Sequence, residues 1–118
     1  MKIWDEWIEV AKKGIFTIQT CKECLNKQFY PRNFCLNCNG KLLSLEPLEK
    51  DKAKIFSFTQ IYRSPNKELF NPPYIIALIE VEDSVKFVCQ LDLNLEEVHI
   101  GKVVNFTNYS EEGIIYFR

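Results

Sequence analysis

The feature that most constrains this chain is the stretch CKECLNKQFYPRNFCLNC, which holds two C-x2-C pairs. Ten residues separate the pair Cys21/Cys24 from the pair Cys35/Cys38. Two residues between thiolates allow one tight turn to present both sulfurs to a single ion, and two such turns complete a tetrahedral shell with metal–sulfur distances near ~2.3 Å. Four protein ligands leave no position for water, so the spacing predicts a structural metal site.

Other uses of paired cysteines fit the sequence less well. Two disulfides would suit a secreted chain, but the stretch MKIWDEWIEVAKK is charged throughout and lacks the apolar centre of a signal peptide. A thioredoxin-like dithiol would open a helix after a strand, whereas both pairs lie among turn residues. A rubredoxin-like iron site uses almost the same ligands. We therefore expect a four-cysteine site for zinc, with iron as the alternative.

The composition indicates a globular protein of the cytoplasm. Of the 118 residues, 47% are apolar and 26% are charged. The sequence contains no run of about 18 apolar residues, so no membrane-spanning helix is expected. Cysteines paired as metal ligands, with Cys89 as a fifth, suit a reducing cytoplasm. A ribbon of about 30 residues buries too small a core, so metal binding is expected to supply much of its folding energy.

Charge is divided unevenly along the chain. Residues 1–50 hold eight Lys/Arg and six Asp/Glu, a formal charge of +2, whereas residues 51–118 hold seven and ten, a formal charge of −3. Nucleic-acid binders usually present a basic face that neutralises phosphates. The C-terminal half is therefore a poor candidate for general DNA or RNA binding.

Residues 3–13 are predicted to form an amphipathic helix, within an N-terminal segment of residues 1–14. Trp4, Trp7, Ile8 and Ala11 recur at helical spacing and make one apolar stripe, which ends before a glycine. Two interpretations of the tryptophans stay open. They pack on the protein's own core, or they cover a partner protein, because Trp is enriched at interface hot spots.

Residues 15–46 are predicted to form a three-stranded zinc ribbon. Short strands are expected at 15–19, 28–30 and 41–45, with a proline ending the second strand and Asn39-Gly40 marking a turn before the third. The polar, turn-prone linker EPLEKDK follows. The boundary with a second domain, residues 47–118, is placed there.

Five strand-like segments after the linker predict a small Greek-key barrel, the OB-fold. They cover residues 53–63, 74–82, 85–91, 103–109 and 114–118, and the connection 91–100 has room for one helical turn. Phe56, Phe58 and Tyr62 are predicted on one face of the long first strand and Ile55 on the other, as a curved barrel strand requires. The expected fold class is mainly β: an N-terminal helix, a three-stranded four-cysteine zinc ribbon and a five-stranded OB barrel.

No catalytic constellation is evident in the sequence, so we expect no enzymatic activity of its own. Cys89 alternates with apolar residues and is interpreted as a buried structural thiol rather than a nucleophile. His99 is the only histidine and has no nucleophile in obvious register.

The segment SPNKELFNPP, residues 64–73, joins the first two barrel strands, where OB-folds border their ligand face. Lys67 could bind an anionic group there, and Phe70 a flat ring. The other interpretation is a plain surface loop stiffened by its prolines.

With ribbon and barrel in this order, the chain resembles the archaeal and bacterial family called domain of unknown function 35 (DUF35). The resemblance rests on CKECLNKQFYPRNFCLNC, where the family has an aromatic-Pro-Arg segment ahead of its second cysteine pair, and on AKIFSFTQIYRSP, PYIIALIEVEDSVKFVCQLD and EEVHIGKVVNF. These stretches cover nearly the whole chain. Leu25 departs from the pattern, because ribbon knuckles often carry Gly at this position.

The resemblance implies an accessory protein of acyl-CoA metabolism. Family members are found beside thiolases, some assemble with acetoacetyl-CoA thiolase and hydroxymethylglutaryl-CoA synthase, and some bind acyl-CoA. We expect a non-catalytic scaffold that docks on a thiolase-type enzyme through the ribbon and the Trp4/Trp7 helix. Arg32 and Lys67 are candidates for the CoA phosphates, and Phe70 is a candidate for a ring contact.

Single-stranded nucleic-acid binding is the alternative function, because OB-folds and zinc ribbons both often bind single strands. Phe56, Phe58 and Tyr62, if exposed, would form a stacking platform. A stacking face normally lies in a basic groove, and the charge of −3 on residues 51–118 argues against it.

Overall fold

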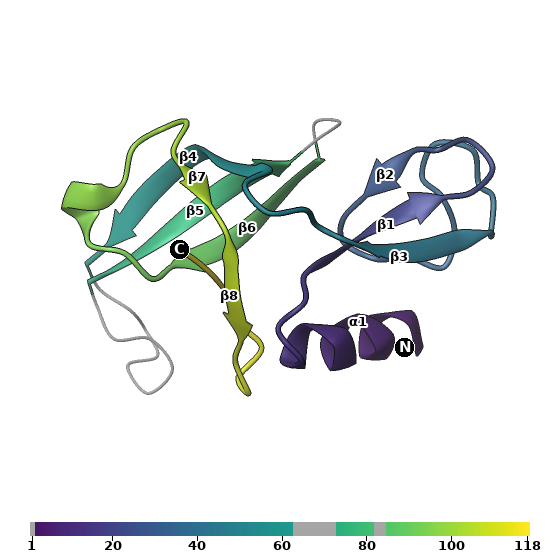
Figure 1. Ribbon diagram of the computed structural model, residues 1–118, viewed down its shortest axis with the longest axis horizontal. Helices are drawn as coiled ribbons and strands as arrows, with labels where there is room; N and C mark the ends of the chain where they lie inside the picture. Colours follow the sequence, from purple (N-terminus) through teal and green to yellow (C-terminus); the bar gives the residue numbers. More distant parts are fainter. Residues whose placement is uncertain (1, 63–72, 82–84) are drawn as a thin grey trace.

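The computed structural model describes residues 2–62, 73–81 and 85–118, which form a helix, a small three-stranded sheet and a barrel-like sheet (Figure 1). The molecule is elongated, 43 × 29 × 23 Å, with the ribbon at one end and the barrel at the other. No helix in the described part of the chain is long and apolar enough to cross a membrane.

Helix α1 (Lys2–Lys12) is amphipathic, as predicted. Trp7 and Ala11 are buried on one face, whereas the acidic residues of the helix are exposed. The helix ends before Gly14, whose φ of 93° is a left-handed conformation that glycine adopts without strain.

The ribbon is an antiparallel sheet in the order β2-β1-β3, which confirms the predicted number of strands. Strand β1 (Thr17–Cys21) lies in the middle, between β2 (Lys27–Gln28) and β3 (Leu43–Pro47). All five residues of β1 are buried, so this strand forms the centre of the ribbon. It begins two residues later than predicted, because Ile15 still donates its N–H to the carbonyl of Val10 at the end of the helix (3.3 Å).

The second sheet has the order β7-β4-β5-β6-β9-β8 and nearly closes into a barrel. The predicted strand 103–109 is interrupted at Asn105, so one stretch of chain pairs with β4 at one end and with β9 at the other. This stretch, which contains β7 and β8, therefore joins the two edges of the sheet. Strands β6 and β9 pair in parallel. With β7 and β8 counted as one stretch, five stretches of chain build the barrel. The strands are β4 (Ala53–Ile61), β5 (Tyr74–Val81), β6 (Val85–Leu91), β7 (Val103–Val104), β8 (Phe106–Tyr109) and β9 (Ile115–Phe117).

The connection after β6 contains the expected helical turn. It is a single turn of 3₁₀ helix, η2 (Leu95–Glu97), which lies on the surface. The predicted hairpin turn at residues 82–84 lies outside the described residues.

A β-bulge corrects the predicted faces of β4. Its pairing with β5 skips one residue between Ile55 and Ser57, so Phe56 is an extra residue. An extra residue shifts the in–out alternation of a strand by one position. Phe58 therefore packs against the core, as Ile55 does, while Phe56 is exposed. The predicted grouping of Phe56 and Phe58 on one face is wrong.

One aromatic core joins the helix, the ribbon and the barrel. Trp7 contacts Phe29 of the ribbon and Tyr109 of β8, with ring centroids 5.5 and 5.4 Å apart. Phe29 and Phe16 in turn contact Phe87 of β6, at 5.2 and 4.8 Å. The ribbon therefore helps to bury the barrel's core. The division into units 1–14, 15–46 and 47–118 stays a prediction.

Candidate metal centre and the junction beside it

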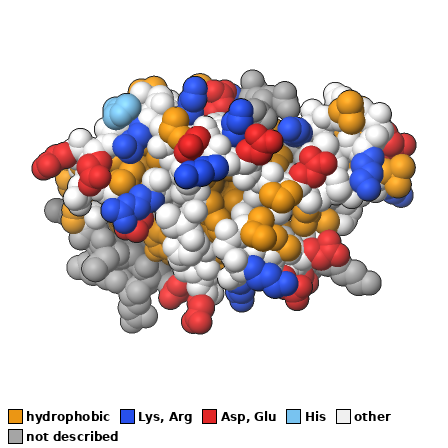
Figure 2. All heavy atoms as spheres, in the orientation of Figure 1, with side chains coloured by type: hydrophobic (Ala, Val, Ile, Leu, Met, Phe, Trp, Pro, Cys, Tyr) orange, Lys and Arg blue, Asp and Glu red, His pale blue; other side chains and the backbone are white. Residues whose placement is uncertain are grey.

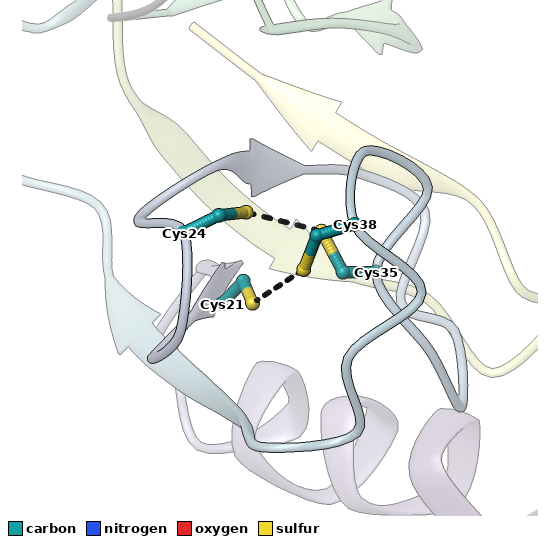
Figure 3. A group of neighbouring side chains, drawn as sticks. All are labelled: Cys21, Cys24, Cys35 and Cys38. Carbon is teal, nitrogen blue, oxygen red and sulfur yellow. Dashed lines mark hydrogen bonds between the residues drawn. The ribbon is translucent and has the colours of Figure 1, made fainter.

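The four paired cysteines converge on one point of the ribbon (Figure 3). Their sulfur atoms all lie within 4.8 Å of one another, and the separations Cys21–Cys38 and Cys24–Cys35 are 3.6 Å. All four are free thiols. The structure thus brings together the residues that the sequence singled out, and such a donor set could hold one four-coordinate metal ion.

The two cysteine turns, or knuckles, share one backbone geometry. In each, the first cysteine accepts a hydrogen bond from the N–H four residues later and donates its own N–H to the carbonyl five residues later. The donors are Leu25 (2.9 Å) and Asn39 (2.8 Å), and the acceptors are Asn26 and Gly40 (2.8 Å each). Residues at corresponding positions of the two knuckles can therefore be compared directly.

The residue after each pair takes a left-handed conformation. Its φ is 65° at Leu25 and 62° at Asn39. Asn visits this conformation routinely, whereas for most other residues it costs about 1–2 kcal/mol, because the Cβ atom approaches the following carbonyl oxygen. The first knuckle therefore contains strain that the second avoids.

Nitrogen donors surround the sulfur atoms. The backbone N–H groups of Asn37 and Gly40 lie 3.4 Å from the sulfurs of Cys35 and Cys38. The side-chain amide of Asn37 lies 3.5 Å from the sulfur of Cys24. Such hydrogen bonds favour the thiolate form, which is the form that binds metals.

The thiols also influence one another's ionisation. The Asn37 side chain, followed by the Asn26 backbone, lowers the pKa of Cys24 to about 6. At Cys38 the N–H of Gly40 lowers the pKa, but the neighbouring thiols, Cys24 first, and burial together raise it to about 12. Four thiolates this close repel one another, so all four ionise together only around a cation. An all-sulfur donor set suits zinc or iron.

Two buried glutamines, which the sequence analysis missed, hold the loop between the knuckles. Gln19 of β1 and Gln28 of β2 are cross-strand partners, and Nε2 of Gln28 donates to Oε1 of Gln19 (2.6 Å). Gln19 also bonds the carbonyl and the N–H of Arg32 (2.7 and 2.9 Å). Gln28 bonds the carbonyl of Phe34 (3.1 Å) and the N–H of Leu36 (3.0 Å). No local pattern marks this pair, because its role depends on the register between strands.

Trp4 and Trp7 stack at the junction of helix, ribbon and barrel, with ring centroids 5.0 Å apart. Trp7 is fully buried, and its Nε1 donates a hydrogen bond to the carbonyl of Thr17 (3.0 Å). The interpretation that both tryptophans cover a partner is therefore wrong for Trp7, which belongs to the protein's own core. Trp4 is half-buried and lies beside Tyr30, at 6.1 Å between ring centroids.

An apolar hollow of about 270 Å³ adjoins this junction. It is lined by Trp4 of the helix, Tyr30 of the ribbon, Val88 of β6 and Ile114 beside β9. The hollow is therefore built from all three parts of the molecule.

Of the three residues that the sequence suggested as CoA contacts, the structure describes only Arg32. The Arg32 side chain is exposed, and its backbone is fixed by Gln19. Lys67 and Phe70 lie outside the described residues, so a common site for the three residues stays a prediction.

The remaining singled-out residues lie apart from the metal centre. Cys89 is 3% exposed on β6, and burial raises the pKa of its thiol to about 12. Its interpretation as a buried thiol is confirmed. His99 is exposed, with Nδ1 3.2 Å from the carbonyl oxygen of Ile100.

A four-cysteine ribbon followed by an OB barrel defines the class of this protein, and comparison with known sequences gives its family. A family model described as the C-terminal OB-fold domain of ChsH2 matches residues 46–107, just over half of the chain. The chain belongs to the DUF35 family, as the resemblance indicated.

Two curated relatives cover most of the chain. A "DUF35 domain-containing scaffold protein" of Methanocaldococcus jannaschii is 27% identical over 110 residues, which are 91% of this chain and 78% of the relative. A "probable enoyl-CoA hydratase alpha subunit" of Thermomonospora curvata is 25% identical over 100 residues, which are 83% of this chain but only 30% of that protein.

Two solved structures share the whole fold. One, called "Ltp2-ChsH2(DUF35) aldolase", has a TM-score of 0.80 and 22% identity over 100% of this chain and 94% of the other. The other, a DUF35 family protein of unknown function from Sulfolobus solfataricus, has a TM-score of 0.70 and 20% identity over 97% and 84% of the two chains. At these identities the likeness concerns the fold.

Proposed function

We propose that this chain is a non-catalytic accessory protein of acyl-CoA metabolism, which docks on a thiolase-type enzyme and holds it in a complex. Hydroxymethylglutaryl-CoA synthase is the proposed second partner. The observation that carries this proposal is the similarity along 91% of the chain to a protein named as a DUF35 scaffold. That similarity includes both the ribbon and the barrel.

The names of two further relatives support the metabolic assignment. One similar structure is called an aldolase with a DUF35 component, and one similar sequence is named an enoyl-CoA hydratase subunit. Both names belong to enzymes of carbon–carbon or acyl-CoA chemistry, which supports the proposed metabolic role.

A non-catalytic role is consistent with the described side chains. A metal held by four cysteines has no open position for a substrate. The thiol of Cys89 is buried with a raised pKa, so it is a poor nucleophile. His99 is exposed and lies in the connection that contains η2, between β6 and β7 of the barrel.

The metal is proposed to be zinc, bound by Cys21, Cys24, Cys35 and Cys38 in a reducing cytoplasm. Elemental analysis of the purified protein tests this assignment and should give about one zinc per chain. A red protein with visible absorption and stoichiometric iron would identify the rubredoxin-like alternative instead.

Acyl-CoA is the proposed small ligand. The apolar hollow beside Trp4 and Tyr30 would take the acyl group, and the exposed Arg32, two residues from Tyr30, would contact phosphate. Calorimetric titration with acyl-CoA and with free CoA separates these contacts. Arg32→Ala should weaken binding of both ligands, whereas Trp4→Ala should weaken only that of acyl-CoA. Absence of binding by the wild-type chain would remove this part of the proposal.

Single-stranded nucleic-acid binding is less well supported. Phe58 packs inward, so Phe56 and Tyr62 are the exposed aromatics of the expected platform. Lys86 already lies 4.8 Å from the centre of the Phe56 ring. An oligonucleotide titration at low salt tests this alternative, and tight, salt-sensitive binding would favour it over the scaffold function.

The deciding experiment is co-purification of the tagged chain from its native extract at moderate salt, followed by mass spectrometry. Recovery of a thiolase-type enzyme in stoichiometric amount is the expected result. Nuclease-sensitive recovery of transcription or ribosomal proteins would overturn the proposal.

A further inference from the structure

We propose that the tip of the ribbon is a docking surface for a protein that presents an apolar depression bordered by carboxylates. This inference rests on the proposed function, in which the partner is a thiolase-type enzyme. The surface, here called the knuckle patch, consists of four exposed apolar side chains: Leu25, Phe34, Leu36 and Leu42.

The three leucines of the knuckle patch surround the metal centre. Leu25 and Leu36 each directly follow a cysteine of the centre. The carbonyl of Leu42 accepts a hydrogen bond from the N–H of Lys22 (2.8 Å), the residue that follows Cys21. Because the four sulfurs lie within 4.8 Å of one another, the backbones that carry these leucines lie close together around the metal centre. They are 74%, 56% and 61% exposed, so the protein's own fold leaves them uncovered.

Leu25 is the residue that most clearly serves something other than folding. Its equivalent in the second knuckle, Asn39, takes the same left-handed conformation with a side chain that tolerates it. Glycine would relieve the strain at Leu25, and the exposed leucine side chain buries little apolar surface in return. A residue that costs folding free energy and stays exposed is explained if its side chain is buried in a complex.

The charges beside the knuckle patch indicate the chemistry of the partner. Lys22 and Lys41, both exposed, are the backbone and chain neighbours of Leu42. The exposed Glu23 lies between the two knuckles, and residues 15–46 as a whole hold four Lys/Arg against two Asp/Glu. These basic groups also compensate the net negative charge of a divalent ion with four thiolates. Figure 2 shows hydrophobic, basic and acidic side chains next to one another at the right-hand end, where Figure 1 places the ribbon. A carboxylate-bordered surface complements this arrangement, whereas a second copy would bring lysines together.

The test is titration of the purified thiolase-type enzyme with the metal-loaded chain, comparing Leu25→Gly with the matched control Asn39→Gly. Both substitutions place glycine at the same left-handed position of equivalent turns. Leu25→Gly should make the ribbon more resistant to chelator and to denaturant, yet weaken binding by about tenfold or more. Asn39→Gly should leave the affinity within about twofold of wild type. Leu36→Ser, which involves no left-handed backbone, should weaken binding as Leu25→Gly does.

The outcomes distinguish failure of the knuckle patch as the docking surface from failure of the proposed scaffold function. If the wild-type chain binds the enzyme and Leu25→Gly and Leu36→Ser bind equally well, the knuckle patch is not the docking surface and the scaffold function stands. If the wild-type chain does not bind, both are overturned. Binding that is unaffected by salt would contradict the carboxylate border. A wild-type dimer that Leu25→Gly converts to monomer would identify a second copy as the occupant.

Discussion

At the scale of single residues, the side chain of Gln19 determines where the loop before the second knuckle lies. This side chain is fully buried and bonds both backbone groups of Arg32 as well as the amide of Gln28. A buried polar group without a partner costs folding free energy. Loss of the Gln19 amide would therefore remove its hydrogen bonds and also leave the groups that it bonds in Arg32 and Gln28 without a partner.

Replacing Gln19 by leucine should lower the free energy of unfolding by about 2–4 kcal/mol, because two backbone groups of Arg32 lose their partner. Urea unfolding of the metal-loaded protein measures this change. Gln60→Leu on the half-buried part of β4 is the control and should change stability by less than about 1 kcal/mol. Equal effects of both substitutions would show that Gln19 has no special role.

The thiol of Cys89 provides a second residue-scale prediction. Because burial raises its pKa to about 12, it stays protonated and unreactive in the folded protein at pH 8. Iodoacetamide followed by peptide mass spectrometry should label Cys89 only after unfolding. The partly exposed Cys24, whose pKa the Asn37 side chain and the Asn26 backbone lower to about 6, should be labelled as soon as a chelator removes the metal. Rapid labelling of Cys89 in the native state would contradict its burial.

At the scale of elements, the bulge in β4 decides which aromatic residue enters the barrel. Without the bulge, Phe56 and Phe58 would lie on the same face of the strand. The extra residue sends Phe58 into the core and leaves Phe56 outside, beneath the ammonium group of Lys86.

The two phenylalanines should consequently respond differently to the same substitution. Phe58→Ala should cost about 2–3 kcal/mol of stability through the cavity that it leaves. Phe56→Ala should cost less than about 1 kcal/mol, because it removes an exposed ring and one cation–π contact. Paired thermal or urea unfolding curves give both values. The reverse order would place the bulge elsewhere in the strand.

At the scale of the whole molecule, the ribbon and the barrel depend on each other through aromatic contacts. Phe29 of the ribbon packs on Phe87 of the barrel, and Trp7 of the helix packs on Phe29. Metal loss should therefore have consequences beyond the ribbon, since the ribbon buries too little apolar surface to fold well without its ion.

Removing the metal with a chelator should abolish hydrogen-exchange protection in β1 and β3 and leave β5 and β6 protected but less stable. The barrel stays folded because its own strands pair nearly all the way round, and it loses stability because Phe29 and Phe16 no longer cover Phe87. Cys35→Ser should reproduce the pattern without chelator. Unchanged protection of β1 after complete metal removal would show that the ion is not structural.

The sequence alone determined those features that depend on local spacing. The two C-x2-C pairs predicted the four-sulfur cluster, because the ligand geometry is confined to short turns. The order of apolar segments predicted the ribbon and the barrel, because strand number follows from local alternation and turn residues.

Only the tertiary structure decided features that depend on register and on packing between distant segments. The bulge at Phe56 inverted one face of β4, and the opposition of Gln19 to Gln28 created a buried amide pair. Trp7 and Trp4 are equivalent in helical periodicity, but Trp7 became a fully buried core residue and Trp4 a half-buried one, because Trp7 also packs on Phe16 and Tyr109. The physical reason is common to all three cases: cross-strand pairing and burial are set by contacts between segments far apart in the chain, which local pattern does not encode.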